Sequence, residues 1–535
     1  MRPTFTAVRD GNELILDVPY NLRGYVRQVR GSRWNAGRKR WTMPATPLSL
    51  ESAEKVCDLI VSPAHHRKSE GGPRVQQFPN DEPKLWRHQR EAVEWLEDEL
   101  DGQTCSGRML WYGMGTGKTR IVLEFIERNV RGHVIVACPK SVIPAWAKEV
   151  KKVGYLGHQA VPLRGGTMLK RTNLAFEAVS AGPAKIVIVN YDIIWRKPFS
   201  EIVEDGTFEM IVADESHALK GRSSKRALWF RRAYKWSRLR LALTGTPISN
   251  GQLSDFFQQS AFLDPGLFGT SITDFEARFA IKPANQHFVV GWRNLQQFNE
   301  SMFRLVRHED RSVLDLPPEV DIHRAFDLTK TTRRVYEELR DDFVARIEAG
   351  VVMAPQAIVL VNKLQQVTGG FVYHDDEITG HKGTENLGVD RENLLKEIML
   401  DLGDEPCVIF YKFKEDRRRI GDLLERMGVE YLSLSGNVNE LDKWQAGEAT
   451  ALVIQVQSGS LGIDLTRAAV CIFYSIGYSL DHYVQARARI SRPGQERSTT
   501  FVHMSARGTI DEKIMSALRR KEDLVEQVLA GKESL

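Results

Sequence analysis

The sequence has few cysteines and no long apolar run. Its five cysteines among 535 residues are scattered and form no C-x-x-C pair, so neither a disulfide framework nor a zinc site is indicated. No window approaches the roughly eighteen consecutive apolar residues of a membrane-spanning helix. The first residues carry no apolar core followed by a small-residue cleavage site. We therefore expect a cytoplasmic protein (nucleoid-associated, or in the host cytoplasm if phage-encoded) without a membrane partner.

Net basic charge is scarce outside the N-terminal segment. Residues 1–44 contain nine Arg or Lys and three Asp or Glu, which, against a total net charge of +5, leaves the rest of the chain at about −1. A compact basic segment is a candidate contact for nucleic-acid phosphates. A solvated, arginine-rich surface is the alternative, and charge alone does not separate the two.

Low-complexity tracts and short tandem repeats are also missing, and apolar residues make up 42% of the chain, as in globular domains. The chain nevertheless changes character several times along its length. We expect a small αβ domain at 1–60, a linker at 61–83, a first α/β lobe at 84–300 with a helical insertion from about 252, a junction with a helical insertion at 301–390, and a second α/β lobe at 391–535.

Each of the two lobes holds short apolar runs separated by helical segments. This alternation predicts parallel sheets that are covered on both faces by helices. The expected strands lie at 108–113, 133–138, 185–190, 209–214 and 240–245 in the first lobe, and at 406–411, 430–435, 451–456, 469–474 and 499–504 in the second.

A glycine-rich loop follows the first expected strand of the first lobe and precedes a helical segment. In Gly115-Thr116-Gly117, backbone N–H groups can close around phosphates at the positive end of the new helix. Lys118 is expected to reach the β- and γ-phosphates of a nucleotide, and the Thr119 hydroxyl to bind Mg²⁺. A chance glycine turn before a helix is the alternative, but the order of strand, loop and helix favours nucleotide binding.

An acidic pair, Asp214-Glu215, ends another apolar strand of the same lobe. Two adjacent carboxylates are costly there unless a cation is close. Mg²⁺ supplies that charge, with Asp214 as its ligand, and Glu215 is placed to orient and deprotonate the attacking water. Alone, such a pair is more often a helix cap, but a phosphate loop about a hundred residues earlier reverses that preference.

Two further segments carry hydroxyl or guanidinium groups. Thr244 and Thr246, in LTGTP, form either a strand-to-turn transition stopped by proline or a switch segment that responds to the nucleotide. In the second lobe, Gln485, Arg489 and Arg492 fall on one helical face. The two arginines are candidates to compensate charge in a phosphoryl-transfer transition state, whereas in isolation they would indicate a solvated or nucleic-acid-facing helix.

These motifs, in this order, resemble those of the superfamily-two helicases, and more closely their Snf-type branch of double-stranded DNA translocases. The resemblance covers most of residues 85–520. It rests on LWRHQREAVEWL (85–96), MGTGKT (114–119), ACPKSVIPAWAKEV (137–150), VNYDII (189–194), DESH (214–217), LTGTP (243–247), RLVRHEDRSVLDLPP (304–318), VIFYKF (408–413), QSGSLGIDLT (457–466), QARARISRPGQ (485–495) and GTIDEKI (508–514).

The resemblance implies two tandem RecA-like lobes that hold ATP and Mg²⁺ in the cleft between them and bind DNA. The resemblance implies that Gln89 and Gln485 also bind ATP. It also implies that Thr244, Thr246, Gly462 and Asp464 couple hydrolysis to movement along DNA. Lys140, Tyr191, Ser458 and Gly459 fall in segments that face DNA in relatives. Ala488, Ser491 and the Trp111-Tyr112-Gly113 segment depart from the branch's usual residues, but the catalytic set matches, so we expect ATP hydrolysis.

The N-terminal segments VPYN (18–21), RGSRWN (30–35) and RKRWTMP (38–44) resemble the HARP domain of annealing helicases, which rewind single-stranded bubbles. Basic and aromatic side chains alternate there and suit phosphate neutralisation with base stacking at a single-strand/double-strand junction. The alternative is that both tryptophans form the core of this small domain. The candidate DNA-binding residues are Arg33, Trp34, Arg38, Lys39, Arg40 and Trp41.

The combined expectation is a DNA-dependent ATPase that translocates on duplex, forked or otherwise branched DNA and remodels or anneals it. A strand-separating helicase is one alternative. A DNA-binding scaffold whose motor has decayed is another.

Overall fold

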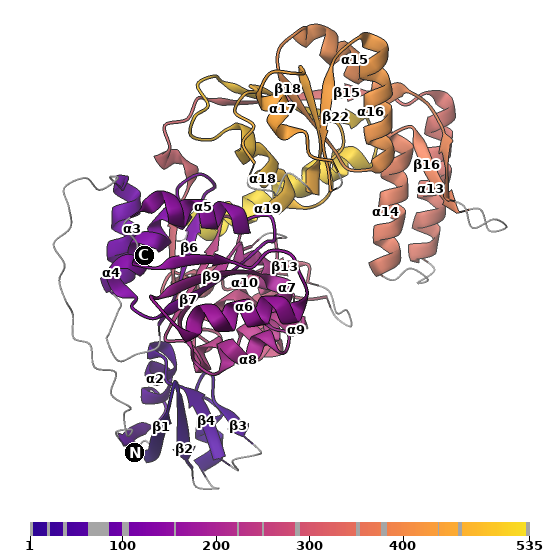
Figure 1. Cartoon of the computed structure of the whole chain (residues 1–535). Coiled ribbons are helices and arrows are strands. Elements are labelled where there is room, and N and C mark those ends of the chain that lie inside the picture. The colour runs from indigo at the N-terminus through magenta and orange to yellow at the C-terminus, as the bar shows by residue number, and fades with distance from the viewer. Residues whose placement is uncertain are drawn as a thin grey trace. The chain divides into compact units, whose positions relative to one another are not determined.

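The computed structural model forms two compact units, Met1–Val313 with Val525–Leu535, and Leu314–Leu524 (Figure 1). No helix among the residues described combines the length and apolarity needed to cross a membrane. The structure describes the chain except for residues 1–3, 19–21, 36–39, 63–84, 99–105, 155–156, 222–223, 249–250, 284–288, 349–353, 376–381, 437, 458–462 and 531–535.

The N-terminal domain is a five-stranded sheet with two short helices. Its sheet has the order β3-β4-β2-β1-β5, and only the β1–β5 pair is parallel. Alternate side chains of the strands, such as Phe5, Leu14 and Leu16, form one apolar core beneath the sheet. The elements are β1 (Thr4–Asp10), β2 (Glu13–Asp17), α1 (Arg23–Val26), β3 (Arg33–Asn35), β4 (Arg40–Pro44), α2 (Pro47–Glu54) and β5 (Asp58–Ser62).

The first lobe is built on a seven-stranded parallel sheet of order β14-β6-β11-β10-β7-β9-β8. Its strands are β6 (Ser106–Tyr112), β7 (His133–Cys138), β8 (Gln159–Pro162), β9 (Lys185–Asn190), β10 (Phe208–Asp214), β11 (Leu239–Thr244) and β14 (Val306–Glu309). Its main helices are α3 (Arg87–Asp98), α4 (Lys118–Asn129), α5 (Ile143–Val153), α6 (Met168–Ser180), α7 (Tyr191–Ile194), α8 (Phe199–Glu204), α9 (Lys225–Phe230), α10 (Ser254–Leu263), α11 (Ile272–Phe279) and α12 (Leu295–Met302).

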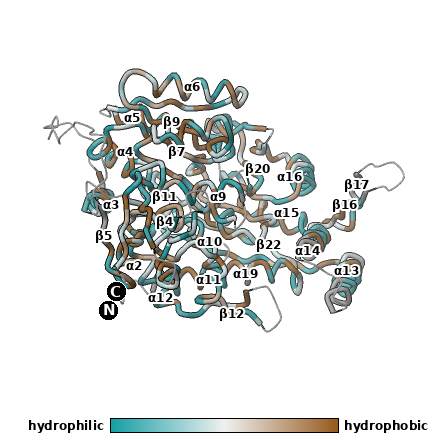
Figure 2. Tube along the Cα trace, turned by 90° about the horizontal axis from the view of Figure 1, so that it is seen from below, coloured by the Kyte–Doolittle hydropathy of each residue, from teal (hydrophilic) through white to brown (hydrophobic). Residues whose placement is uncertain are grey.

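Strand alternation divides the interior of this lobe into two cores. Val134 and Val136 of β7 join the core beneath α3, α4 and α5, whereas Ile135 and Ala137 join the core beneath α6, α8 and α10. Helices therefore cover both faces, which explains why the central strands are apolar without interruption. Along α6, hydrophilic and hydrophobic residues both occur, as expected of a helix with one solvent-facing side (Figure 2).

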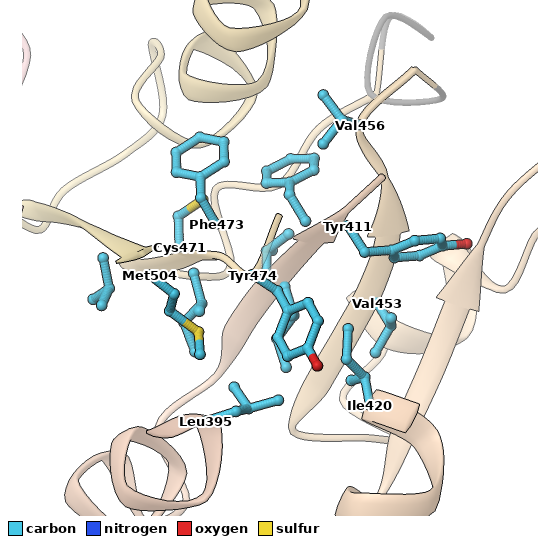
Figure 3. Close-up of a cluster of buried hydrophobic side chains, with 14 of the residues drawn as sticks. Leu395, Tyr411, Ile420, Val453, Val456, Cys471, Phe473, Tyr474 and Met504 are labelled. Atoms are coloured by element: carbon cyan, nitrogen blue, oxygen red, sulfur yellow. The ribbon is translucent and has the colours of Figure 1, made fainter. Parts of the chain in front are cut away.

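The second unit is built on a six-stranded parallel sheet of order β15-β22-β21-β18-β20-β19. One apolar core contains Tyr411, Val453, Phe473 and Met504 from its strands (Figure 3). The strands are β15 (Glu319–Phe326), β18 (Cys407–Tyr411), β19 (Tyr431–Leu434), β20 (Ala451–Gln455), β21 (Val470–Phe473) and β22 (Thr499–Ala506). Helices α13 (Lys330–Glu348), α14 (Ala354–Thr368), α15 (Asp390–Leu402), α16 (Lys414–Met427), α17 (Leu441–Gln445), α18 (Leu480–Ile490) and α19 (Ile510–Ala530), and the hairpin β16 (Phe371–Asp375) and β17 (Lys382–Asn386), complete it.

All ten expected strands of the two lobes are present, so the predicted α/β class with two parallel sheets is confirmed. Further strands of these sheets lie outside the ten expected ones, among them β14 and β15. β14 extends the first sheet to Glu309, beyond residue 300. β15 belongs to the second sheet although it lies within the expected junction at 301–390. Both strands lie at the edge of their sheet. Both also contain charged residues, which are common in edge strands because they prevent pairing with another chain.

Candidate nucleotide-binding site

The glycine loop lies at the carboxyl end of β6 and leads directly into α4. Gly115 and Gly117 both have a φ of 85°, a left-handed conformation that favours glycine. The Gly117 Cα also sits against Gln89, because a Cβ placed there would come within 2.2 Å of the Gln89 Nε2. Glycine is therefore required at this position both by the backbone and by the neighbouring glutamine.

Gln89 and its neighbour His88 hold the loop from the side of α3. The Gln89 Nε2 donates to the carbonyl of Thr116 over 3.1 Å, and the His88 Nε2 lies 2.8 Å from the same oxygen. The Gln89 Oε1 accepts from the backbone N–H of Trp86 over 3.0 Å. Gln89, an expected ATP-binding residue, is thus in direct contact with the glycine loop, and His88 is a loop contact that the sequence motifs did not single out.

Lys118 is the first residue of α4, and its side chain returns over the loop. Its Nζ donates to the carbonyls of Tyr112, over 2.9 Å, and Gly113, over 3.2 Å. The Thr116 hydroxyl donates to the Gly113 carbonyl over 2.8 Å, so the loop is closed on itself. Thr119 follows in the first turn of the helix, half-buried.

The acidic pair ends β10, two strands away from β6 in the same sheet. Asp214 is buried, and its carboxylate accepts from the indole of Trp146 over 2.7 Å and from the backbone of Glu215 over 3.0 Å. Burial and the charge of Glu215 raise the pKa of Asp214 to about 6, against the opposing effects of Trp146 and Lys118. Glu215 has a φ of 53°, a strained value for a non-glycine residue.

The donor set fits a nucleotide with a divalent cation. A buried carboxylate with a raised pKa gains most from a nearby cation, and Asp214 already lies within the field of Lys118. A hydroxyl at the start of a helix and carboxylate oxygens are ligands that Mg²⁺ prefers. Within the described ranges there is no cluster of three or more His, Cys, Asp or Glu that could hold a metal ion.

The switch segment follows β11, the strand between β6 and β10. Thr244 is fully buried and its hydroxyl accepts from the N–H of Thr246 over 3.0 Å. The indole of Trp111, one of the residues that depart from the branch, donates to the Gly245 carbonyl over 3.1 Å. The segment is therefore tied to β6, the strand that leads into the phosphate loop.

Gln259 of α10 joins the acidic motif to the switch segment, and the sequence analysis did not find it. Its Oε1 accepts from the Ser216 hydroxyl over 2.7 Å, and its Nε2 donates to the Pro247 carbonyl over 2.8 Å. All three groups are buried. A glutamine on an otherwise apolar helix face was the available signal, because a buried amide needs partners.

In the second unit, Gln485 and Arg489 lie on α18, and Arg492 follows it. Gln485 is buried, whereas Arg489 and Arg492 are half-buried, and the Arg492 guanidinium donates to the Ile463 carbonyl over 3.1 Å. The Asp464 carboxylate accepts from the backbone and hydroxyl of Thr466. Gly462 lies outside the described residues.

The candidate DNA-binding residues have different environments. Lys140 is exposed, whereas Tyr191 is buried and its hydroxyl donates to the Asp214 carbonyl over 2.8 Å. In the N-terminal domain, Trp41 is 8% exposed and belongs to the core, while Trp34 is 44% exposed. Arg33 and Arg40 form ion pairs with Glu13 and Asp17, and Arg38, Lys39, Ser458 and Gly459 lie outside the described residues.

Comparison with known families identifies the family of the chain. The SNF2-related domain matches residues 88–369, which is more than half of the chain, and the helicase conserved C-terminal domain matches residues 390–494. The chain therefore belongs to the SNF2-related family, as its motifs indicated. This assignment agrees with the expected enzyme class, an ATP hydrolase of the helicase-like type.

Individual relatives are distant. The putative ATP-dependent helicase/translocase YwqA of Bacillus subtilis is 25% identical over 86% of this chain and 50% of its own length. The DNA repair and recombination protein RDH54 of Saccharomyces cerevisiae is 24% identical over 82% of this chain and 51% of its own length. The Sulfolobus solfataricus SWI2/SNF2 ATPase core in complex with dsDNA is 21% identical, with a TM-score of 0.39, covering 84% of this chain and 94% of that one. The chain spans about half the length of the curated relatives it matches.

Proposed function

We propose that the chain is a DNA-dependent ATPase that translocates on duplex or branched DNA and remodels or anneals it. The observation that carries the proposal is the convergence of three motifs at the carboxyl edge of one parallel sheet. Lys118 lies beyond the end of β6, and Thr244 and Asp214 are the last residues of β11 and β10; the three strands are neighbours in that sheet, in the order β6-β11-β10. Ligands of α/β sheets bind at this edge.

Each group has an assigned task in this proposal. Gly115, Thr116 and Gly117 cradle phosphate oxygens, Lys118 neutralises the β- and γ-phosphates, and Gln89 fixes the loop and contacts the base. Thr119 and Asp214 hold Mg²⁺, which, when bound, withdraws charge from the phosphate oxygens. The remaining catalytic tasks belong to Glu215, which orients and deprotonates the attacking water, and to Arg489 and Arg492, which stabilise the developing charge; Gln485 also binds ATP.

DNA is the expected track because two relatives carry the names helicase/translocase and DNA repair and recombination protein. The exposed Trp34 and its basic neighbours support binding at junctions, where unpaired bases can stack. This last point favours annealing or remodelling over strand separation.

ATP turnover across a panel of DNAs tests the proposal. We expect weak basal hydrolysis that rises strongly with forked or bubble DNA, and loss of turnover in Lys118→Ala and Glu215→Gln. If no DNA stimulates the wild-type protein, it is not a DNA motor. Strand-annealing and strand-separation assays on the same forks then distinguish annealing from unwinding. Duplex RNA is the control that tests whether stimulation is specific to DNA.

A further inference from the structure

The N-terminal domain is fixed to the first lobe at the edge opposite the nucleotide loop. The Asn12 amide donates to the carbonyl of Ser237, just before β11, over 3.4 Å, and the Arg30 guanidinium donates to the carbonyl of Leu267 over 2.6 Å. The Thr46 hydroxyl donates to the buried carboxylate of Asp264 over 2.6 Å. Since the phosphate loop follows the carboxyl ends of the strands, contacts at the amino ends leave it untouched.

A cavity of about 380 Å³ lies in this junction. The N-terminal domain and the first lobe both line it. Arg33 comes from the edge strand β3 of the N-terminal domain. The segment between α9 and β11 of the lobe contributes Arg231, Arg232 and Tyr234. Arg232 is exposed, and its guanidinium lies 5.9 Å from the centre of the Trp236 ring. Three of the residues that line the cavity are thus arginines, Arg33, Arg231 and Arg232.

Positive charge at this cavity exceeds the local negative charge. Glu13 contacts two of the lining residues, Tyr234 and Arg33, and Arg33 and Lys235 already contact its two oxygens over 2.7 and 2.6 Å. Burial, together with the charge of Arg33, lowers the pKa of Arg231. Burial also lowers the pKa of Lys235, with Arg33 and Arg232 contributing, despite its bond to Glu13. The cations thus repel one another, and an anion in the cavity relieves that repulsion.

We propose that this cavity binds the backbone phosphate of DNA, so that the N-terminal domain and the first lobe hold one DNA strand jointly. Guanidinium groups match phosphate oxygens in a bidentate manner. DNA is favoured over an acidic protein segment because the next residue on β3, Trp34, offers an exposed ring on which a base can stack. The inference rests on the proposed function for the identity of the ligand, and it adds a contact site that lies away from the motor's nucleotide loop.

DNA binding without nucleotide, measured by anisotropy over a series of salt concentrations, tests the site in the full chain. We expect Arg232→Ala to weaken forked-DNA binding about tenfold and to reduce the slope of log K against log salt by about 0.9, the value of one phosphate contact. Arg232→Lys keeps the charge and should keep most of the slope. Arg164→Ala, at an exposed arginine in the loop after β8, is the matched control and should change neither quantity.

Arginine footprinting with phenylglyoxal tests the same site in the wild-type protein, so its result does not depend on whether a variant folds. Forked DNA should protect Arg232 and leave Arg164 reactive. Unchanged slope in Arg232→Ala together with no protection of Arg232 would overturn the proposal, as would protection by a polyglutamate peptide but not by DNA. If DNA binds and protects as expected but never stimulates ATP turnover, the motor function fails and the phosphate site stands.

Discussion

At the scale of single residues, Arg487 is held by contacts that its position in the sequence does not indicate. Arg487 of α18 contacts both Asp321 and Glu319 of the edge strand β15, over 2.6 and 2.7 Å, and lies 4.1 Å from the centre of the Phe501 ring. Arg489, on the same helix, and Arg492, which follows it, are the catalytic candidates of the proposed mechanism. Spacing along the sequence does not mark Arg487 as a structural residue, whereas its contacts with β15 do.

Arg487→Ala should therefore lower stability. We expect a loss of about 1–2 kcal/mol in the free energy of unfolding, because two acids lose a partner whose side chain is 16% exposed, while their own partial exposure limits the effect. Chemical denaturation measures it. Arg497→Ala, which removes an exposed pair with Glu405, is the control and should cost at most about 0.5 kcal/mol. Equal losses of unfolding free energy in the two variants would show that the ion pairs of Arg487 with β15 stabilise the protein no more than an exposed pair does.

Gln259→Leu tests the link between the acidic motif and the switch segment. The change keeps the side-chain volume but leaves the Ser216 hydroxyl and the Pro247 carbonyl buried without this partner. We expect a loss of about 1–3 kcal/mol in stability and a lower ratio of DNA-stimulated to basal ATP turnover. Ser260→Ala removes a buried hydroxyl bonded only within α10, to the Phe257 carbonyl, and should leave the ratio unchanged. A normal ratio in Gln259→Leu would mean that this amide is only structural.

At the scale of elements, the interior strands of the two parallel sheets and the edge strand β19 could be predicted from sequence, whereas the other three edge strands could not. β7 and β9 are buried on both faces and are read directly as apolar runs. β8, β14 and β15 lie at sheet edges and contain exposed or half-buried polar residues, so no apolar run marks them. The phosphate loop and acidic pair could be placed because they follow interior strands. Gln259 could not, because its role depends on partners at Ser216 and Pro247.

Gly266→Ala should loosen the N-terminal domain from the first lobe. A Cβ at Gly266 would lie 2.5 Å from both the backbone nitrogen and the hydroxyl of Ser49 in α2, so the domain must shift. We expect faster backbone hydrogen exchange in α2 with little change in β7. Gly24→Ala, where a Cβ meets nothing within 4 Å, is the control. Identical exchange in the two variants would mean that docking tolerates the displacement.

The same junction should weaken in acid. Burial opposes ionisation of Glu13, but its contacts with Lys235 and Arg33 prevail and lower its pKa below the ordinary value of 4.5. A lowered folded-state pKa contributes stability that is complete above pH 4.5 and is lost as the pH falls below it. Limited proteolysis between the domain and the lobe should thus accelerate below that pH. In Glu13→Gln it should be fast already at neutral pH and vary less with acidity; an unchanged profile would assign the acid sensitivity to other groups.

At the scale of the whole molecule, the sequence could supply the order of the domains but not the docking of the first one. Glu13 and Lys235 are 222 positions apart, and no motif records that they meet. The C-terminal helix shows the same limitation. Ile514 and Leu518 belong to the core of the second unit, while Val528 belongs to a core of the first. Such long-range contacts follow from packing, which local patterns of residues do not encode.

The last prediction concerns the two units acting as one enzyme. In the proposed mechanism Lys118 of the first unit binds phosphate, whereas Arg489 of the second is needed only as charge develops during transfer. Arg489→Ala should therefore retain ATP binding, measured with a fluorescent nucleotide, while DNA-stimulated turnover falls by about 10³-fold. Lys118→Ala should lose binding as well, and Arg497→Ala should behave as wild type.

Because both charges act on the same phosphoryl group, the double variant Lys118→Ala/Arg489→Ala should be slowed by less than the product of the two single losses. Multiplicative losses would instead show that the two residues act in separate steps. Substantial turnover in Arg489→Ala would show that the catalytic residues lie in the first unit. Arg489 and Arg492 would then be assigned to DNA binding, the alternative that their spacing alone could not exclude.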